Sequence, residues 1–184
     1  ELIEYYKGIF TTLSSCASRQ LEEVTFRRAT ISVPELMATA GKYFRKVYKG
    51  NKAHIDFKIQ LLEGRITGDW NQLRFLLENL IDEACSVTLD GAVCLSARED
   101  GEFIRFLFTD MRREKTREEL NQLFYPDLSR MTAGEKGELY GTEYLVCKQI
   151  IRDHDEFAGR RGCRINAEPG KEGGFTIYFT LPKK

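Results

Sequence analysis

Asn79 and Glu83 are the polar pair whose spacing could support chemistry, because residues four apart share one face of a helix. Magnesium readily accepts carboxylate oxygen, so Glu83 is a chemically reasonable metal ligand. The competing interpretation is a solvated acidic surface, since Glu78 and Asp82 lie on the same stretch. Asp110 is a second candidate because it ends a predicted strand. The competing interpretation is structural: a carboxylate at a strand end can accept hydrogen bonds from the amides of the following turn.

Cysteine and histidine chemistry has little support. The 5 cysteines are an odd number, scattered and without a C-x-x-C pair, which argues against a disulfide framework or zinc site and suits a reducing compartment. Cys85 and Cys147 lie among apolar residues of predicted helices and are interpreted as core residues. The 2 histidines leave little room for a metal site or catalytic triad. His154 is interpreted as a cap at the end of a helix, and neither it nor His54 has the context of a phospho-acceptor.

The composition is that of an ordinary soluble domain of 184 residues, 42% hydrophobic and 30% charged. Lys+Arg 28 balance Asp+Glu 28, so net charge favours neither nucleic acid nor an anionic membrane. The apolar runs are far shorter than the roughly 20 residues of a spanning helix. We therefore expect a cytoplasmic segment without membrane contact, although a longer parent protein can carry an anchor elsewhere. Three basic pairs are predicted to be solvated surface: Arg27-Arg28, Arg112-Arg113 and Arg160-Arg161.

The chain is predicted to consist of two regions. Residues 1–26 are predicted to form an N-terminal helix, because apolar residues from Leu2 to Val24 recur at helical spacing. This helix either packs on the following domain or ends an upstream helical bundle, in which case a homodimer through it is conceivable. Residues 27–184 are predicted to be one domain, since no repeat or low-complexity linker interrupts them.

Capping residues and apolar periodicity predict an alternation of helices and strands in residues 27–184. Ser32, Asp69 and Thr116 are predicted N-caps, and Asp90-Gly91 and Asp100-Gly101 are predicted hairpin-type turns. Helices are predicted at 33–48, 70–88, 117–124 and 140–153, and strands at 54–59, 65–67, 92–97, 102–110, 162–167 and 174–181. The predicted core residues of the first two helices are Leu36, Ala40, Tyr43, Phe44, Val47, Leu73, Leu76, Leu77, Leu80, Ala84 and Val87. This order predicts an α+β fold, a two-layer sandwich with helices on one face of a mixed, mostly antiparallel sheet.

Four segments, in order, resemble the ATP-binding domain of sensor histidine kinases, part of the gyrase–Hsp90–kinase–MutL (GHKL) ATPase superfamily. They are GDWNQLRFLLENLIDEACSVT (68–88), FTDMRREKTREELNQLFYP (108–126), EYLVCKQIIRDH (143–154) and GCRINAEPGKEGGFTIYFTLP (162–182). The resemblance covers roughly residues 24–182 and implies a histidine kinase-like ATPase fold.

The same resemblance implies a pocket for ATP and magnesium. Asn79 and Glu83 would hold the metal, with Glu83 standing where the family has a second asparagine. Asp110 would accept the exocyclic amine of adenine. Gly141 and Thr142 would line the nucleotide.

The glycine boxes of this pocket are degenerate. The D-x-G-x-G box becomes DMRRE (110–114), and the later G-x-G-x-G box becomes LYGTE (139–143), in which only Gly141 remains. Gly174 stands where the family usually has a threonine near adenine. Because glycines let backbone amides approach phosphate closely, we expect ATP and magnesium to bind weakly or not at all.

The expected function is therefore that of a sensor histidine kinase-like domain in two-component-type signalling, impaired in ATP binding and acting as a regulatory or interaction module. Its expected partners are an upstream sensor or dimerisation region and a response regulator. An active ATP–magnesium-dependent histidine kinase domain with a non-standard site stays open as the alternative. A different enzyme or binder on the same fold also stays open.

Overall fold

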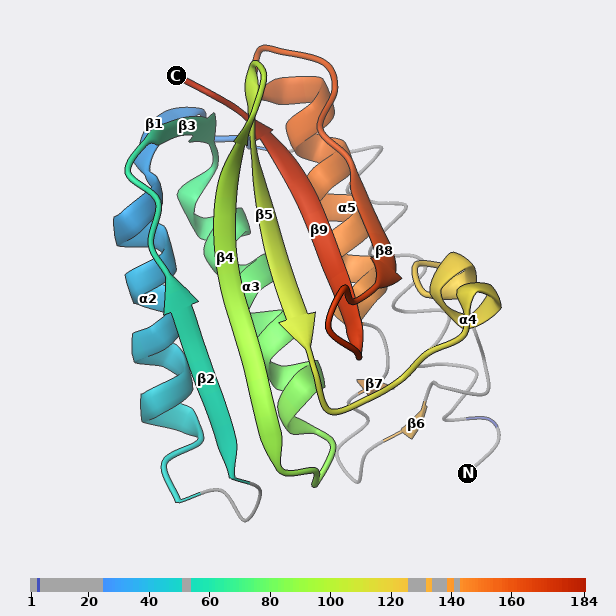
Figure 1. Cartoon of the computed structure of the whole chain (residues 1–184). Coiled ribbons are helices and arrows are strands. Elements are labelled where there is room, and N and C mark those ends of the chain that lie inside the picture. The colour runs from blue at the N-terminus through green and yellow to red at the C-terminus, as the bar shows by residue number, and fades with distance from the viewer. Residues whose placement is uncertain (1–2, 4–24, 51–53, 126–131, 134–138, 141–142) are drawn as a thin grey trace.

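The computed structural model describes residue 3 and residues 25–50, 54–125, 132–133, 139–140 and 143–184. Its helices are α2 (Val33–Val47), α3 (Trp70–Cys85), α4 (Arg117–Gln122) and α5 (Glu143–Phe157), and its main strands are β2 (Ile55–Gln60), β4 (Gly91–Asp100), β5 (Phe103–Asp110), β8 (Ile165–Pro169) and β9 (Phe175–Pro182). These strands form one sheet in the order β2-β4-β5-β9-β8. Figure 1 shows α2, α3 and α5 on one face of this sheet. The predicted α+β fold is confirmed.

The sheet is mixed, as predicted. β2 runs parallel to β4, whereas the β4–β5, β5–β9 and β8–β9 pairs are antiparallel. The Asp100-Gly101 turn joins β4 to β5 as expected. The Asp90-Gly91 prediction was wrong: the element before this dipeptide is α3 rather than a strand, and Gly91 is the first residue of β4. The Asp90 carboxylate accepts a 2.9 Å hydrogen bond from the His54 amide. A turn dipeptide does not reveal which element precedes it.

Strand β1 (Ala29–Ser32) was not predicted from the sequence. It pairs antiparallel with β3 (Arg65–Gly68), and Ile31 lies opposite Ile66. Both isoleucines are at most 3% exposed, so this ribbon extends the core. Four residues are too few for a period-two pattern to stand out. A second small ribbon pairs β6 (Thr132–Ala133) with β7 (Leu139–Tyr140).

The N-caps of α2 and α3 lie where they were predicted. The Ser32 hydroxyl accepts a hydrogen bond from the Glu35 amide at 3.4 Å, and the Asp69 carboxylate accepts one from the Gln72 amide at 3.1 Å. Helix α3 buries one face against the sheet, and in the second layer Phe106 and Phe179 stack with ring centres 5.0 Å apart. The buried residues of α3 are Leu73, Leu76, Leu77, Leu80, Ile81 and Ala84.

The ends of both helices differ from the predictions. Helix α3 ends at Cys85 rather than at Thr88, because Ser86 closes it with a hydroxyl that donates to the Glu83 carbonyl at 2.6 Å. Val87 therefore lies beyond the helix. Val47 was also predicted wrongly as core: it lies in the last turn of α2 and is 50% exposed. In both helices the apolar periodicity of the sequence continues beyond the last residues that pack against other elements, so the sequence pattern overestimated the buried stretch.

The cysteines fit the expectation of free thiols. Within the described residues, Cys85, Cys94, Cys147 and Cys163 are free. Cys147 is fully buried, as predicted. Cys85 is half-buried, and burial raises its pKa to about 12, so it is a neutral thiol at physiological pH.

The predicted N-terminal helix over residues 1–26 falls almost entirely outside the described residues. Of that stretch, Ile3 and residues 25–26 are described, and residues 25–28 have no regular secondary structure. Dimerisation through this region therefore stays a prediction. Across the described residues, no helix is long and apolar enough to span a membrane.

His154 is a buried, neutral side chain that connects α5 to Asp69, the N-cap of α3, by a hydrogen bond, and it is not a charged helix cap. Its ring is 0% exposed, and its Nδ1 lies 2.8 Å from the Ile150 carbonyl oxygen. Its Nε2 accepts a hydrogen bond from the Asp69 amide at 3.0 Å. Because a carbonyl can only accept and an amide can only donate, Nδ1 carries the proton and the ring is uncharged. Burial lowers the pKa of His154, although the Ile150 bond and the Asp69 charge oppose this.

We expect the free energy of unfolding to fall between pH 7.5 and pH 5.5 because of His154. In the unfolded chain the ring takes up a proton near its ordinary pKa of 6.5, whereas the folded ring binds it only at lower pH. The unfolded state therefore binds more protons in this window, and the loss reaches about 1.4 kcal/mol per pH unit. Urea unfolding of the parent and of His154→Gln, with exposed His54 retained in both, checks this. An equal pH dependence in both proteins would contradict the assignment.

Candidate functional site

The candidate site lies where the end of β5 meets the last turn of α3. Alternate residues of β5 are buried, and this alternation turns its last residue, Asp110, inward. The Asp110 side chain is 1% exposed. Glu83 lies in the last turn of α3 with its side chain 16% exposed. The pair Arg112-Arg113 follows β5 after a single residue, Met111, and supplies the positive charge.

Arg112 is buried against Asp110, with 1% of its side chain exposed. Its Nε donates to Oδ1 at 2.9 Å and its Nη2 donates to Oδ2 at 2.8 Å, while its amide also donates to Oδ1 at 2.9 Å. The guanidinium further donates to the Ala84 carbonyl at 2.6 Å and to the Leu89 carbonyl at 3.0 Å. Arg112 thus satisfies carbonyls at and beyond the end of α3 while it neutralises the strand-end carboxylate.

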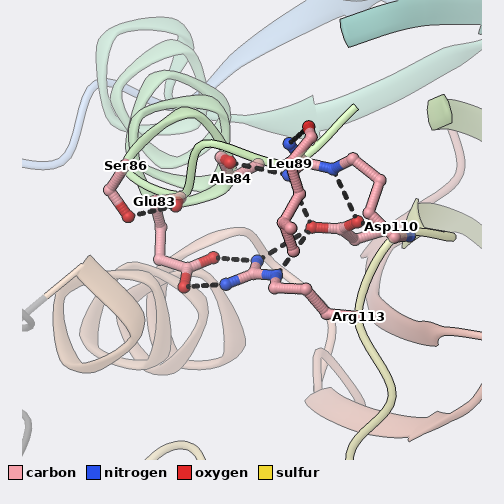
Figure 2. Close-up of polar contacts among 7 residues, drawn as sticks. Glu83, Ala84, Ser86, Leu89, Asp110 and Arg113 are labelled. Carbon is pink, nitrogen blue, oxygen red and sulfur yellow. Dashed lines mark hydrogen bonds and ion pairs between the residues drawn. The ribbon is translucent and has the colours of Figure 1, made fainter. Parts of the chain in front are cut away.

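Arg113 joins the two carboxylates. Its Nη1 and Nη2 donate to Oε1 and Oε2 of Glu83 at 2.9 and 2.8 Å, and its Nε donates to Oδ2 of Asp110 at 2.9 Å. Figure 2 shows the Arg113 side chain between Glu83 and Asp110. This paired contact uses the planar fork of a guanidinium, which a lysine ammonium does not have. The side chain is 13% exposed.

The charges of this network support one another. Burial by itself raises the pKa of Asp110, but the hydrogen bonds from Arg112 and the charges of Arg113 and Arg112 outweigh burial and hold the pKa below its ordinary value. Burial lowers the pKa of Arg113, yet the bonds to Glu83 raise it above its ordinary value. Tyr144, near the start of α5, is 6% exposed, and burial together with the Glu83 charge raises its pKa. Two positive groups therefore balance two negative ones next to a neutral phenol.

The loop that carries the arginines also contacts the turn between β8 and β9. The Glu114 carboxylate accepts a 2.9 Å hydrogen bond from the Gly174 amide. Gly174 has a φ of 68°, and a Cβ built there would lie 2.0 Å from the Asp110 carbonyl oxygen. A threonine side chain, which the resemblance leads one to expect at this position, has no space here. Phe175 is 1% exposed, and the Arg113 guanidinium lies 5.3 Å from its ring centre.

The structure brings together two of the predicted site residues, Glu83 and Asp110. Asn79 uses its side-chain nitrogen within its own helix, donating to the Phe75 carbonyl at 2.7 Å. Gly141 and Thr142 lie outside the described residues. In the described part of the chain, no group of three or more His, Cys, Asp or Glu side chains could hold a metal ion.

The prediction that Arg112-Arg113 is solvated surface was wrong. Sequence reasoning treated the neighbouring acids as evidence for a solvated surface, whereas one of them, Asp110, is a buried partner of both arginines, and Glu83, distant in the sequence, pairs with Arg113. Sequence reasoning also missed the place of Tyr144 beside Glu83. The available signal was the charge balance itself: two arginines stand two and three residues after a carboxylate that the strand pattern turns inward.

This arrangement does not fit magnesium or adenine at the two carboxylates. All the carboxylate oxygens of Asp110 and Glu83 accept hydrogen bonds from Arg112 or Arg113. Magnesium needs oxygen ligands in a near-octahedral arrangement, and a guanidinium lies against the oxygens that would provide them. Adenine recognition likewise needs a carboxylate oxygen that can accept from an amine.

Comparison with known proteins gives a consistent result. A profile of the family "Histidine kinase-, DNA gyrase B-, and HSP90-like ATPase" matches residues 68–184. The adaptive-response sensory kinase SasA of Thermosynechococcus vestitus is 26% identical over 176 residues, which make up 95% of this chain and 44% of that protein. The chain thus spans less than half the length of this curated relative.

Solved histidine kinases share the fold at low sequence identity. Histidine kinase ThkA, in complex with the response regulator protein TrrA, superposes with a TM-score of 0.66 at 18% identity, covering 97% of this chain and 49% of that one. Histidine kinase AdeS of Acinetobacter baumannii gives a TM-score of 0.66 at 16% identity, covering 94% and 74%. The family profile covers more than half of the chain and agrees with this fold. The chain belongs to the histidine kinase-, DNA gyrase B- and HSP90-like ATPase family.

Proposed function

We propose that this chain is a histidine kinase-like ATPase domain of a two-component-type signalling protein, that it is impaired in ATP binding, and that it acts as a regulatory or interaction module. Its similarity to a sensory kinase supports the signalling role. The ThkA structure contains a response regulator, which supports a response regulator as the first partner to test. An upstream sensor or dimerisation region is the second proposed partner.

The observation that carries the proposal is the occupation of both candidate carboxylates by the chain's own arginines. Asp110 is held by Arg112 and Arg113, and Glu83 by Arg113. ATP–magnesium would have to separate these buried ion pairs before it could use either carboxylate. Breaking a buried pair costs about 3–5 kcal/mol. A cost of about 4 kcal/mol weakens binding roughly a thousandfold, which turns a micromolar site into a millimolar one.

We expect calorimetric titration of the parent with ATP–magnesium to give a dissociation constant of about 1 mM or weaker. At 1 mM ligand the free energy of unfolding should then rise by less than about 0.5 kcal/mol, because stabilisation follows RT ln(1 + [L]/Kd). An opened variant, Glu83→Asn/Arg112→Gly/Arg113→Gly, restores a neutral amide at 83 and removes both guanidinium groups. It should bind at least tenfold more tightly, a gain of about 1.4 kcal/mol.

The control is Arg160→Gly/Arg161→Gly, which also removes two guanidinium groups but from exposed arginines, whose side chains are 50% and 74% accessible. This control should leave nucleotide affinity unchanged. Circular dichroism establishes whether the opened variant is folded, and the parent titration stands by itself if it is not. Micromolar binding by the parent would refute the proposal. If Glu83→Asn then weakened that binding, Glu83 would be an adapted metal ligand and an active histidine kinase domain would be the better description.

A further inference from the structure

Arg112 and Arg113 with their partners Glu83 and Asp110 form a network that connects separate secondary-structure elements of the site. Glu83 belongs to α3 and Asp110 ends β5, and Arg113 bonds to both. Arg112 adds bonds to the carbonyls of Ala84 and Leu89 at the end of α3. The loop after β5 is thereby fastened to the end of α3 through side chains with little solvent exposure.

The same loop also holds the turn between β8 and β9. The Glu114 carboxylate accepts from the Gly174 amide, and Arg113 and Lys115 each place a cation 5.3 Å from the ring centre of Phe175. Cations over an aromatic face are attracted to it, most strongly where the site is shielded from water. The segment 112–115 thus contacts α3, β5 and the start of β9 at once.

We propose that Arg113 is a positioning residue that fastens α3, the end of β5 and the β8–β9 turn in one fixed arrangement, in place of a bound nucleotide. This inference rests on the proposed function, because the arrangement is of use only to a domain that presents its surface without ATP. The domain is then held permanently in one form, so signalling through it depends on its partners rather than on nucleotide.

The geometry explains why an arginine is needed at this position. Nη1 and Nη2 reach both oxygens of Glu83 while Nε still reaches Asp110, so one rigid group spans two elements. A lysine offers one compact ammonium and can serve one carboxylate well, but not both. Arg113→Lys should therefore retain the positive charge but lose most of the hydrogen bonds that join Glu83 of α3 to Asp110 of β5.

Hydrogen exchange followed by NMR tests this inference at two amides with defined acceptors. The Arg112 amide donates to the Asp110 carboxylate and the Gly174 amide to the Glu114 carboxylate. In Arg113→Gln the Arg112 and Gly174 amides should exchange at least tenfold faster than in the parent. In Arg113→Lys they should show an intermediate increase, and in the control Arg152→Gln, at an exposed position of α5, no change.

Amides of the sheet core separate local opening from global loss of stability. Leu95 and Phe106 are fully buried, and their exchange should change less than twofold in Arg113→Gln. If all amides accelerate equally, or if the Gly174 amide is unaffected, Arg113 does not position this loop. Adding 1 mM ATP–magnesium to the parent should leave the Arg112 and Gly174 rates within twofold; a tenfold slowing would overturn the inference. Nucleotide binding detected by calorimetry without such slowing would refute the proposed function and leave the positioning role intact.

Discussion

We expect Arg112→Met to lower the free energy of unfolding by about 3–5 kcal/mol, the cost of breaking a buried ion pair and leaving the other charge in place. Methionine is similar in length to the arginine stem, so little packing is lost. The change in the free energy of unfolding therefore reflects the loss of the guanidinium's charge and hydrogen bonds. The variant removes two side-chain bonds to Asp110 and the bonds to the Ala84 and Leu89 carbonyls. Urea unfolding monitored by circular dichroism measures the change.

The control for this result is Arg160→Met. Arg160 also pairs with a carboxylate at 2.8 Å, that of Glu102, but the two side chains are 50% and 74% exposed. Exposed pairs contribute roughly 0–1 kcal/mol because water screens them. Similar losses for Arg112→Met and Arg160→Met would show that the buried network contributes no more than surface charge does. The double variant Arg112→Met/Asp110→Asn should recover part of the loss, since it removes the carboxylate charge that Arg112 no longer balances.

We expect Gly174→Ala to lower the free energy of unfolding by about 2–5 kcal/mol, for two separate reasons. A residue with a Cβ costs about 1–2 kcal/mol in the left-handed region that Gly174 occupies at φ 68°. Its Cβ would also lie 2.0 Å from the Asp110 carbonyl oxygen and 2.7 Å from Cα of Met111, both backbone atoms. Forcing such an overlap adds about 1–3 kcal/mol as β9 moves away from the end of β5.

Gly101→Ala separates the two causes. Gly101 has a similar φ of 60°, but a Cβ there meets nothing within 4 Å. We expect this variant to lose only the 1–2 kcal/mol of the left-handed conformation. Equal losses in the free energy of unfolding at both positions would mean that the backbone around Gly174 and Asp110 relaxes to accept the added Cβ at no energetic cost. The comparison uses the same substitution in the same backbone region, so the difference measures the contact.

Local elements were predictable because their determinants lie within one turn of chain. The Thr116 hydroxyl accepts from the Glu119 amide and the Glu119 carboxylate accepts from the Thr116 amide, at a separation of three residues. Capping of this kind and apolar periodicity are visible in any short window of sequence. The order of the sequence segments then supplied the fold and its family, and the alternation of β5 placed Asp110 at an inward strand end.

The sequence by itself therefore determined most of the helices and strands and the fold, and it pointed to Glu83 and Asp110, which the structure brings close to each other. Only the tertiary structure decided what binds them, because Arg113 meets Glu83 across 30 residues of chain and Glu114 meets Gly174 across 60. Arg112-Arg113 has the composition of an exposed basic pair, and its burial follows from two carboxylates that separate elements bring together. Charge pairing depends on distance in space, which local sequence does not encode until the sheet and helices are packed.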